Sequence, residues 1–115
     1  MNDMAEIKYF DYKGYKCATI FANGFYCGYV FIDLNSKAGK KIQAIDYDDL
    51  DLEVHGGITF YDDNDESVII GFDCFHGDDI VKYSQGSPED KLRKLICFVI
   101  KELHGLVDQI IEMEN

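Results

Sequence analysis

The first third of the chain alternates short apolar runs with tight turns. Two turn signals, Lys13-Gly14 and Asn23-Gly24, separate three β-rich segments, which are Ile7–Tyr12, Tyr15–Ala22 and Phe25–Ile32. Asn-Gly between such segments is typical of a type I′ hairpin turn, whose two central residues both need positive φ. The pattern therefore predicts three consecutive antiparallel strands.

The second turn also predicts a register. If Asn23-Gly24 is a two-residue loop, Cys27 lies opposite Ile20 and Cys17 lies opposite Val30. The two cysteines are then not partners.

The pattern in the middle of the chain predicts a loop followed by a further hairpin. Residues Asp33–Ala44 lack an apolar period and are expected to form a surface loop. Apolar and polar residues then alternate, which predicts a fourth strand, Leu50–Tyr61. Its expected core side consists of Leu50, Leu52, Val54, Ile58 and Phe60. An acidic turn, Asp62–Glu66, leads to a fifth strand, Val68–Cys74.

The last quarter of the chain predicts one long amphipathic helix. Pro88 suits the first helical position after Ser87, a candidate N-cap, and the apolar period continues to about Glu112. The apolar positions recur at steps of three and four, at Leu92, Ile96, Val99, Leu103, Leu106, Ile110 and Met113. Such a broad stripe covers a sheet, or a sheet and a partner, so a homodimer through this helix is an open alternative.

Together these elements predict a single α+β domain over residues 1–115. We expect a five-strand antiparallel meander sheet with the C-terminal amphipathic helix packed on one face. The start of the chain lacks the basic and apolar segments of an export signal, and no apolar run approaches the ~18 residues of a membrane span. A cytoplasmic protein is the simplest expectation.

Four scattered cysteines agree with a reducing compartment. They form no C-x-x-C pair, which speaks against a zinc ribbon or a thioredoxin-type site. We expect Cys17, Cys27 and Cys97 to be small buried apolar side chains.

The negative charge of the chain is concentrated in its middle. The net charge is −11, and the segment from Asp46 to Asp79 holds twelve acidic residues and no Lys or Arg. Such a field repels nucleic-acid phosphates and attracts basic surfaces, so direct nucleic-acid binding is not expected. The alternative is a solvated acidic surface that aids solubility.

One polar group is a candidate chemical site. It lies at the open end of the hairpin predicted for the fourth and fifth strands. Pairing of Phe60 or Tyr61 with Val68 in that hairpin would place His55 beside Asp73 or Cys74. Glycines around it leave room for a ligand or a close backbone. The group consists of His55, Gly56, Gly57, Asp73, His76 and Asp78.

Several interpretations of this group remain open. As a metal site, His55, Asp73 and His76 would bind a divalent ion through two imidazoles and one carboxylate. As a hydrolytic site, a His base would be oriented by Asp73. As a binding site, glycine-backed amides and imidazoles would hold a small polar or anionic ligand. A structural alternative is a polar cross-strand pair of His55 and Asp73.

The two segments around this group carry a resemblance. The segments Asp49–Phe60 and Gly71–Asp78 resemble a family of small uncharacterised proteins in phages and bacterial mobile elements. The preceding segment, Gly24–Val30, is similar to the upstream strand of that family. The resemblance covers less than half of the chain and brings no known activity. It implies a home in a phage or prophage, and therefore the cytoplasm of a bacterial host.

These observations predict a binding protein rather than an enzyme. We expect an anti-defence inhibitor of the anti-CRISPR kind, whose carboxylates occupy a basic nucleic-acid-binding surface of a host protein such as a CRISPR nuclease or another defence nuclease. The acidic residues expected to make this contact are Asp48, Asp49, Asp62 and Asp63. The alternative is a metal-dependent hydrolase or a small nucleotide-binding protein that uses His55, Asp73 and His76.

Overall fold

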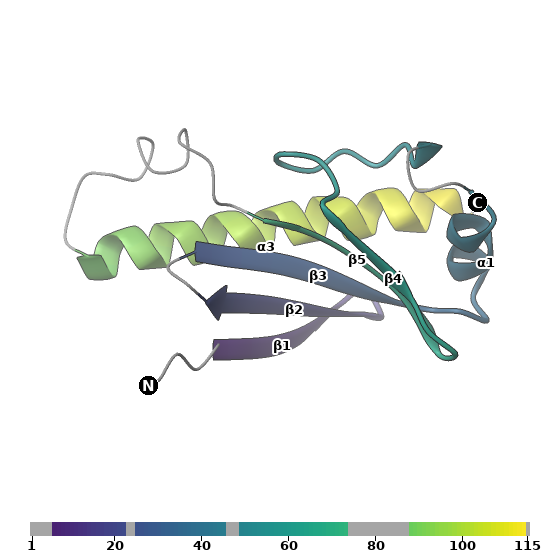
Figure 1. The fold of residues 1–115 in the computed structure, drawn as a ribbon. Coiled ribbons are helices and arrows are strands. Elements are labelled where there is room, and N and C mark those ends of the chain that lie inside the picture. Colours follow the sequence, from purple (N-terminus) through teal and green to yellow (C-terminus); the bar gives the residue numbers. More distant parts are fainter. Residues whose placement is uncertain (1–5, 23–24, 46–48, 74–87, 115) are drawn as a thin grey trace.

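A computed structural model describes residues 6–22, 25–45, 49–73 and 88–114 as an antiparallel sheet with a long helix on one face (Figure 1). This arrangement confirms the predicted α+β class. The strands are β1 (Glu6–Tyr12), β2 (Tyr15–Ala22), β3 (Phe25–Asp33), β4 (Phe60–Asp63) and β5 (Ser67–Asp73), and the helices are α1 (Lys37–Gln43) and α3 (Pro88–Met113).

The strand order differs from that of a simple meander. The five strands lie in the order β1-β2-β3-β5-β4, so β5 pairs with β3 and β4 forms the edge. The chain leaves β3 through α1 and then runs along α3, so it enters the sheet at its far edge (Figure 1). Only the return strand, β5, can then lie beside β3.

The β1–β2 hairpin follows the local turn chemistry. Lys13 and Gly14 have φ values of 51° and 86°, as the two central residues of a type I′ turn require. Across β2 and β3, Cys17 pairs with Val30 and Ile20 pairs with Cys27, which confirms the predicted register.

Helix α1 lies within the segment that we expected to be a loop. The hydroxyl of Ser36 accepts a hydrogen bond from the Gly39 amide at 3.0 Å and caps the helix, and Ala38, Gly39 and Ile42 are buried. A Cβ on Gly39 would lie 2.1 Å from the carbonyl oxygen of Asp33, so the glycine lets the helix approach the end of β3. Two turns are too short for a helical period to be visible, and tertiary packing overrides the low helix propensity of glycine.

The predicted strand Leu50–Tyr61 is mostly not a strand. Its backbone bonds to side chains of α3 instead: the Glu53 amide donates to Gln109 Oε1 and Gln109 Nε2 donates to the Glu53 carbonyl oxygen, both at 2.7 Å. We call residues 50–59 the strap. Leu52 is buried in the core, as its alternating pattern predicted.

A turn inside the strap changes which residues face the core. Gly56 and Gly57 have φ values of 73° and 81°, and the Gly57 amide donates to the Val54 carbonyl oxygen at 2.8 Å. After this turn Tyr61 packs against the core, whereas Phe60, an expected core residue, is exposed.

The β4–β5 hairpin is displaced from the predicted register. Asp63 lies opposite Val68 and Phe60 lies opposite Gly71. Asp62 and Asp63 therefore belong to β4, not to the turn. The turn is held by Asn64, whose side-chain oxygen accepts hydrogen bonds from the amides of Glu66 and Ser67, both at 2.8 Å.

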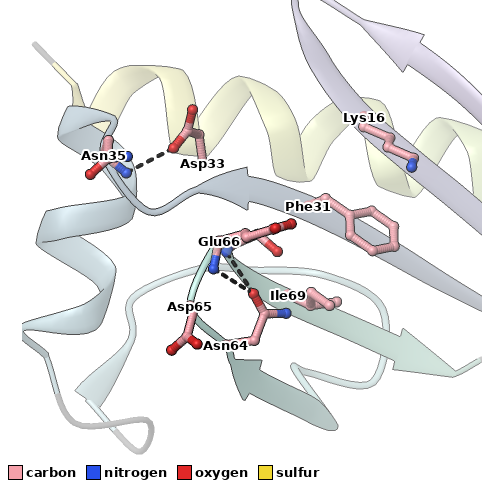
Figure 2. A pocket seen from close by; sticks show the side chains of 9 residues that line it. Lys16, Phe31, Asp33, Asn35, Asn64, Asp65, Glu66 and Ile69 are labelled. Atoms are coloured by element: carbon pink, nitrogen blue, oxygen red, sulfur yellow. Dashed lines mark hydrogen bonds between the residues drawn. The ribbon is translucent and has the colours of Figure 1, made fainter.

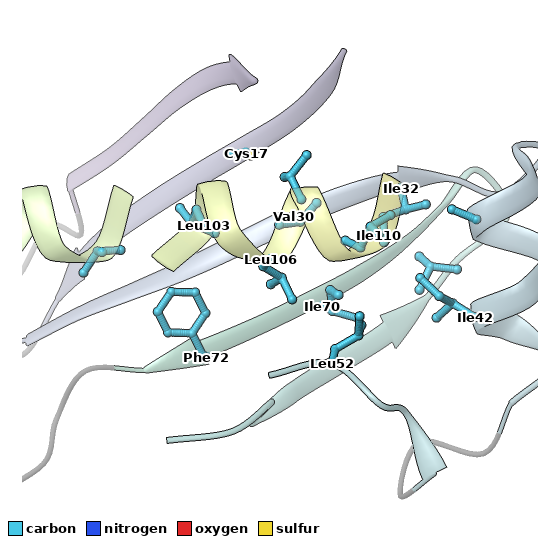
Figure 3. Packing of buried hydrophobic residues seen from close by; sticks show 14 of the residues in the cluster. Cys17, Val30, Ile32, Ile42, Leu52, Ile70, Phe72, Leu103, Leu106 and Ile110 are labelled. Carbon is cyan, nitrogen blue, oxygen red and sulfur yellow. The ribbon is translucent and has the colours of Figure 1, made fainter. Parts of the chain in front are cut away.

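The hydrophobic core lies between the sheet and the helices (Figure 3). Side chains of one parity from β2, β3 and β5 meet the apolar stripe of α3, and α1 closes one end through Ile42. The fully buried members include Cys17, Val30, Ile32, Ile70, Phe72, Val99, Leu103, Leu106 and Ile110. The predicted period of the long helix is confirmed. Within the described ranges, no helix has the length and apolarity needed to cross a membrane.

Candidate interaction surface

His55, the first residue of the predicted polar group, lies on the strap and not on a strand. The His55 amide donates to Glu102 Oε1 of α3 at 2.7 Å, and its ring lies edge-on to Phe98 with centroids 5.0 Å apart. Asp73 ends β5 and pairs with Cys27 of β3. The predicted registers would have placed His55 beside Asp73 or Cys74, but β4 and β5 pair in neither of them.

The remaining members of the group have different outcomes. Gly56 and Gly57 are exposed and form the turn of the strap. His76 and Asp78 lie outside the described residues, so the proposed metal ligands His55, Asp73 and His76 stay a prediction. Among the residues that the structure describes, no three His, Cys, Asp or Glu side chains gather as metal ligands would.

The acidic positions expected to meet a partner are on the surface. Asp49, Asp62 and Asp63 are exposed, and Asp48 lies outside the described ranges. Four further carboxylates of the same part of the chain are also exposed, namely Asp51, Glu53, Asp65 and Glu66. Asp62 and Asp63 lie on the edge strand β4, Asp65 and Glu66 lie in the β4–β5 turn, and Asp51 and Glu53 lie on the strap.

The sheet has a second apolar face, which we call the outer face. Side chains alternate along a strand, so the neighbours of the core residues point away from α3. Ile7, Tyr9 and Phe60 lie on this face with exposed fractions of 47%, 58% and 41%, and they are the exposed large apolar side chains among the described residues. Sequence reasoning missed this face, although the apolar residues of both parities in the first three strands were a visible signal.

Large and small side chains alternate across the outer face. Tyr29 lies over Gly71, where a Cβ would be 2.5 Å from its ring, and its ring meets Phe60 edge-on with centroids 5.3 Å apart. Ala18, opposite Tyr29, is buried beneath its larger neighbours. The result is an aromatic hollow of about 250 Å³ lined from all five strands, including Tyr9, Ala18, Tyr29, Phe31, Phe60 and Ile69.

A larger polar groove continues from this hollow. This acidic groove has a volume of about 660 Å³ and lies between the end of β3 and the β4–β5 turn. Figure 2 shows the side chains that line it. Phe31 and Ile69 line both the hollow and the groove, so the two form one continuous surface. The carboxylates of the groove belong to Asp33, Asp65 and Glu66.

The groove carboxylates have no cationic partner in the described part of the chain. The ion pairs there join Lys8 to Glu6 and Lys13 to Asp108, both away from the groove. Lys16 lines the groove, but its ammonium lies over aromatic rings, 4.6 Å from the Tyr9 centroid and 5.2 Å from the Phe31 centroid. Three carboxylates in one groove thus remain available to an external cation.

Titration of the outer face is set mainly by burial. Burial raises the pKa of the Tyr29 phenol to about 12, with smaller contributions from Cys27 and Asp73. Burial likewise raises the pKa of the Cys27 thiol. Both groups are neutral at pH 7, so the charge on this face comes from Lys16 and the carboxylates.

The arrangement as a whole has the features of a protein-binding surface. An apolar centre with aromatic side chains is bordered by charged groups, which is the composition of many protein interfaces. A comparison of the chain with protein-family models, curated proteins and solved structures finds no match.

Proposed function

We propose that this protein acts by binding a basic surface of another protein, and that it thereby blocks nucleic acid from that surface. The observation that carries the proposal is the exposed, unbalanced negative charge of the middle segment. Every described Asp and Glu from Asp49 to Glu66 is exposed, and no Lys or Arg lies between them. Carboxylates at this density imitate a phosphate track and accelerate association with a basic channel.

The resemblance to small phage proteins supports an inhibitor of a bacterial host protein. A nuclease of a defence system, such as a CRISPR effector, has the required basic channel. Such a nuclease is therefore the class of partner to test first.

Competition with nucleic acid tests this proposal. Immobilised protein is incubated with a bacterial lysate, and captured proteins are eluted with duplex DNA or with increasing salt. We expect a nucleic-acid-binding protein that DNA displaces, because both ligands would use the same basic surface. The purified partner should then lose nuclease or DNA-binding activity when this protein is added.

Charge reversal provides the matched comparison. Asp62→Lys should slow association several-fold through the on-rate, because it removes steering charge beside the groove. Glu112→Lys changes the net charge equally but lies near the end of α3, so it should matter much less. Glu102 is unsuitable as a control because it accepts the His55 amide. Equal binding by both variants, or capture that DNA does not reverse, would refute the proposal.

A further inference from the structure

The outer face and its acidic groove together define the shape and chemistry of a ligand. We infer that they form one docking surface for an extended segment of a partner protein that carries an apolar side chain and, four residues away, an arginine. This inference rests on the proposed function, because it names the part of the basic partner that the surface would recognise.

The aromatic hollow and the acidic groove are continuous. Phe31 and Ile69 belong to both, so a single ligand can fill the aromatic hollow and reach the acidic groove. Tyr29, Phe31 and Asp33 follow one another on the same face of β3. The four residues from the apolar centre at Tyr29 to the carboxylate of Asp33 span about 13 Å of strand. An extended ligand segment would bridge this distance with side chains at positions i and i+4.

The groove is complementary in charge to a cationic side chain. Asp33, Asp65 and Glu66 line the groove without an ion-pair partner among the described residues. A cationic side chain entering from the aromatic hollow would meet these carboxylates. A second copy of the chain is a poor occupant, because two molecules of net charge −11 would repel each other.

The aromatic rings of the outer face already contact a cation of the protein itself. The ammonium of Lys16 lies over the rings of Tyr9 and Phe31, whose centroids are 6.3 Å apart. A guanidinium stacks on aromatic rings and binds carboxylates with two hydrogen bonds, whereas an ammonium is a point charge. An arginine at the junction of hollow and groove would therefore stack on a ring and bind the groove carboxylates at the same time.

Capped five-residue peptides test the docking surface directly. The probe is Phe-Ser-Thr-Ser-Arg, with Lys or Glu replacing Arg, or Ser replacing Phe, in three control peptides. Binding is followed by ¹⁵N–¹H NMR titration of the folded protein, which detects millimolar affinities. We expect the Arg peptide to shift the amides of Ala18, Phe31, Ile69 and Glu66 together. The Lys peptide should bind two- to threefold more weakly, and the Glu and Ser peptides at least fivefold more weakly.

Matched variants locate the contacts. Phe60→Ser removes one wall of the hollow and should weaken binding at least threefold, whereas Cys97→Ser changes an exposed residue of α3 and should have no effect. Glu66→Gln should weaken the Arg peptide two- to fivefold, the range of an exposed ion pair, and Glu112→Gln should not. Lys16→Met should strengthen binding of the Arg peptide, because the internal cation no longer competes.

Several results would overturn the inference. One is a set of amide shifts confined to other faces of the protein, and another is equal binding of the Arg and Glu peptides. A third is unchanged peptide binding by a Phe60→Ser variant that remains folded. Dimerisation in sedimentation equilibrium that Phe60→Ser abolishes would also overturn it, since a second copy would then occupy the face. If Phe60→Ser still captures the basic partner with full salt dependence, the proposed function stands and only the docking surface is wrong.

Discussion

Gly39 of α1 is tightly packed and Gly105 of α3 is not, so replacing each by alanine should change stability in opposite directions. Gly39→Ala places a Cβ 2.1 Å from the Asp33 carbonyl oxygen, so α1 must move away from β3. A Cβ on Gly105 of α3 would meet no atom of a neighbouring element within 4 Å. We expect Gly39→Ala to destabilise the fold by ~2 kcal/mol or more, and Gly105→Ala to stabilise it by ~0.5–1 kcal/mol.

Urea denaturation of both variants measures these changes. The two substitutions are chemically identical and both increase helix propensity, so a difference in sign can come only from tertiary packing. Midpoints that rise for both variants would mean that α1 does not lie against the end of β3.

The three described cysteines should differ in reactivity. Burial, and to a lesser degree Asp11, raises the pKa of the Cys17 thiol to about 11, so about one thiol in a thousand is ionised at pH 8. Burial also raises the pKa of Cys27, whereas Cys97 is exposed on α3, contrary to the sequence-based expectation. We expect iodoacetamide to modify Cys97 at least tenfold faster than Cys17 in the native protein.

Peptide mass spectrometry after timed quenching gives the three rates. In urea the difference should disappear, because unfolding exposes all the thiols. A native Cys17 that reacts as quickly as Cys97 would contradict its burial in the core.

At the scale of elements, the strap depends on two side chains of α3. Gln109 replaces a neighbouring strand by both donating to and accepting from the backbone of Glu53. A net contribution of about 1 kcal/mol per hydrogen bond gives an expected loss of ~1–2 kcal/mol for Gln109→Ala. Hydrogen exchange of the Glu53 amide should accelerate more than exchange in the β2–β3 hairpin.

Glu102 offers a sharper comparison at the next contact. Glu102→Gln keeps an oxygen that accepts the His55 amide, whereas Glu102→Ala removes it. Exchange of the His55 amide should therefore be nearly unchanged in the first variant and faster in the second. Equal acceleration in both variants would show that charge, rather than the acceptor, holds the strap.

For the whole molecule, charge repulsion should limit stability. The net charge is −11, and the two ion pairs among the described residues are exposed and contribute little. Raising sodium chloride from about 20 mM to about 300 mM shortens the Debye length and should therefore raise Tm. Tm should increase by roughly 4 °C for each kcal/mol of repulsion that the salt screens. The double variant Asp62→Asn, Asp63→Asn should begin at a higher Tm and respond less to salt.

Calorimetry or a fluorescence melt across the salt series measures this response. A Tm that falls with salt would mean that attractive pairs outweigh the repulsion of the acidic segment. The result bears on function as well, because the same unbalanced field is proposed to steer a basic partner.

Features that depend on neighbouring residues could be predicted from the amino-acid sequence. The turn at Lys13-Gly14 requires positive φ at both positions, and the register around Cys17 and Cys27 follows from hairpins with two-residue loops. The helix Pro88–Met113 is long enough for its 3.6-residue period to be unmistakable. The exposure of Asp49, Asp62 and Asp63 follows from the cost of burying an unpaired carboxylate.

Features that depend on residues far away in the chain could not be predicted in this way, because long-range packing sets them. Residues 50–59 bond to α3 and do not form a strand. Their backbone amides donate hydrogen bonds to the side chains of Gln109 and Glu102, which lie about fifty positions later in the chain. That choice set the strand order, the register of β4 and β5, and the placement of His55 against α3. Side chains alternate between the two faces of the sheet, and α3 covers only one of these faces. The aromatic hollow exists because the other face of the sheet has no such cover in the described part of the chain.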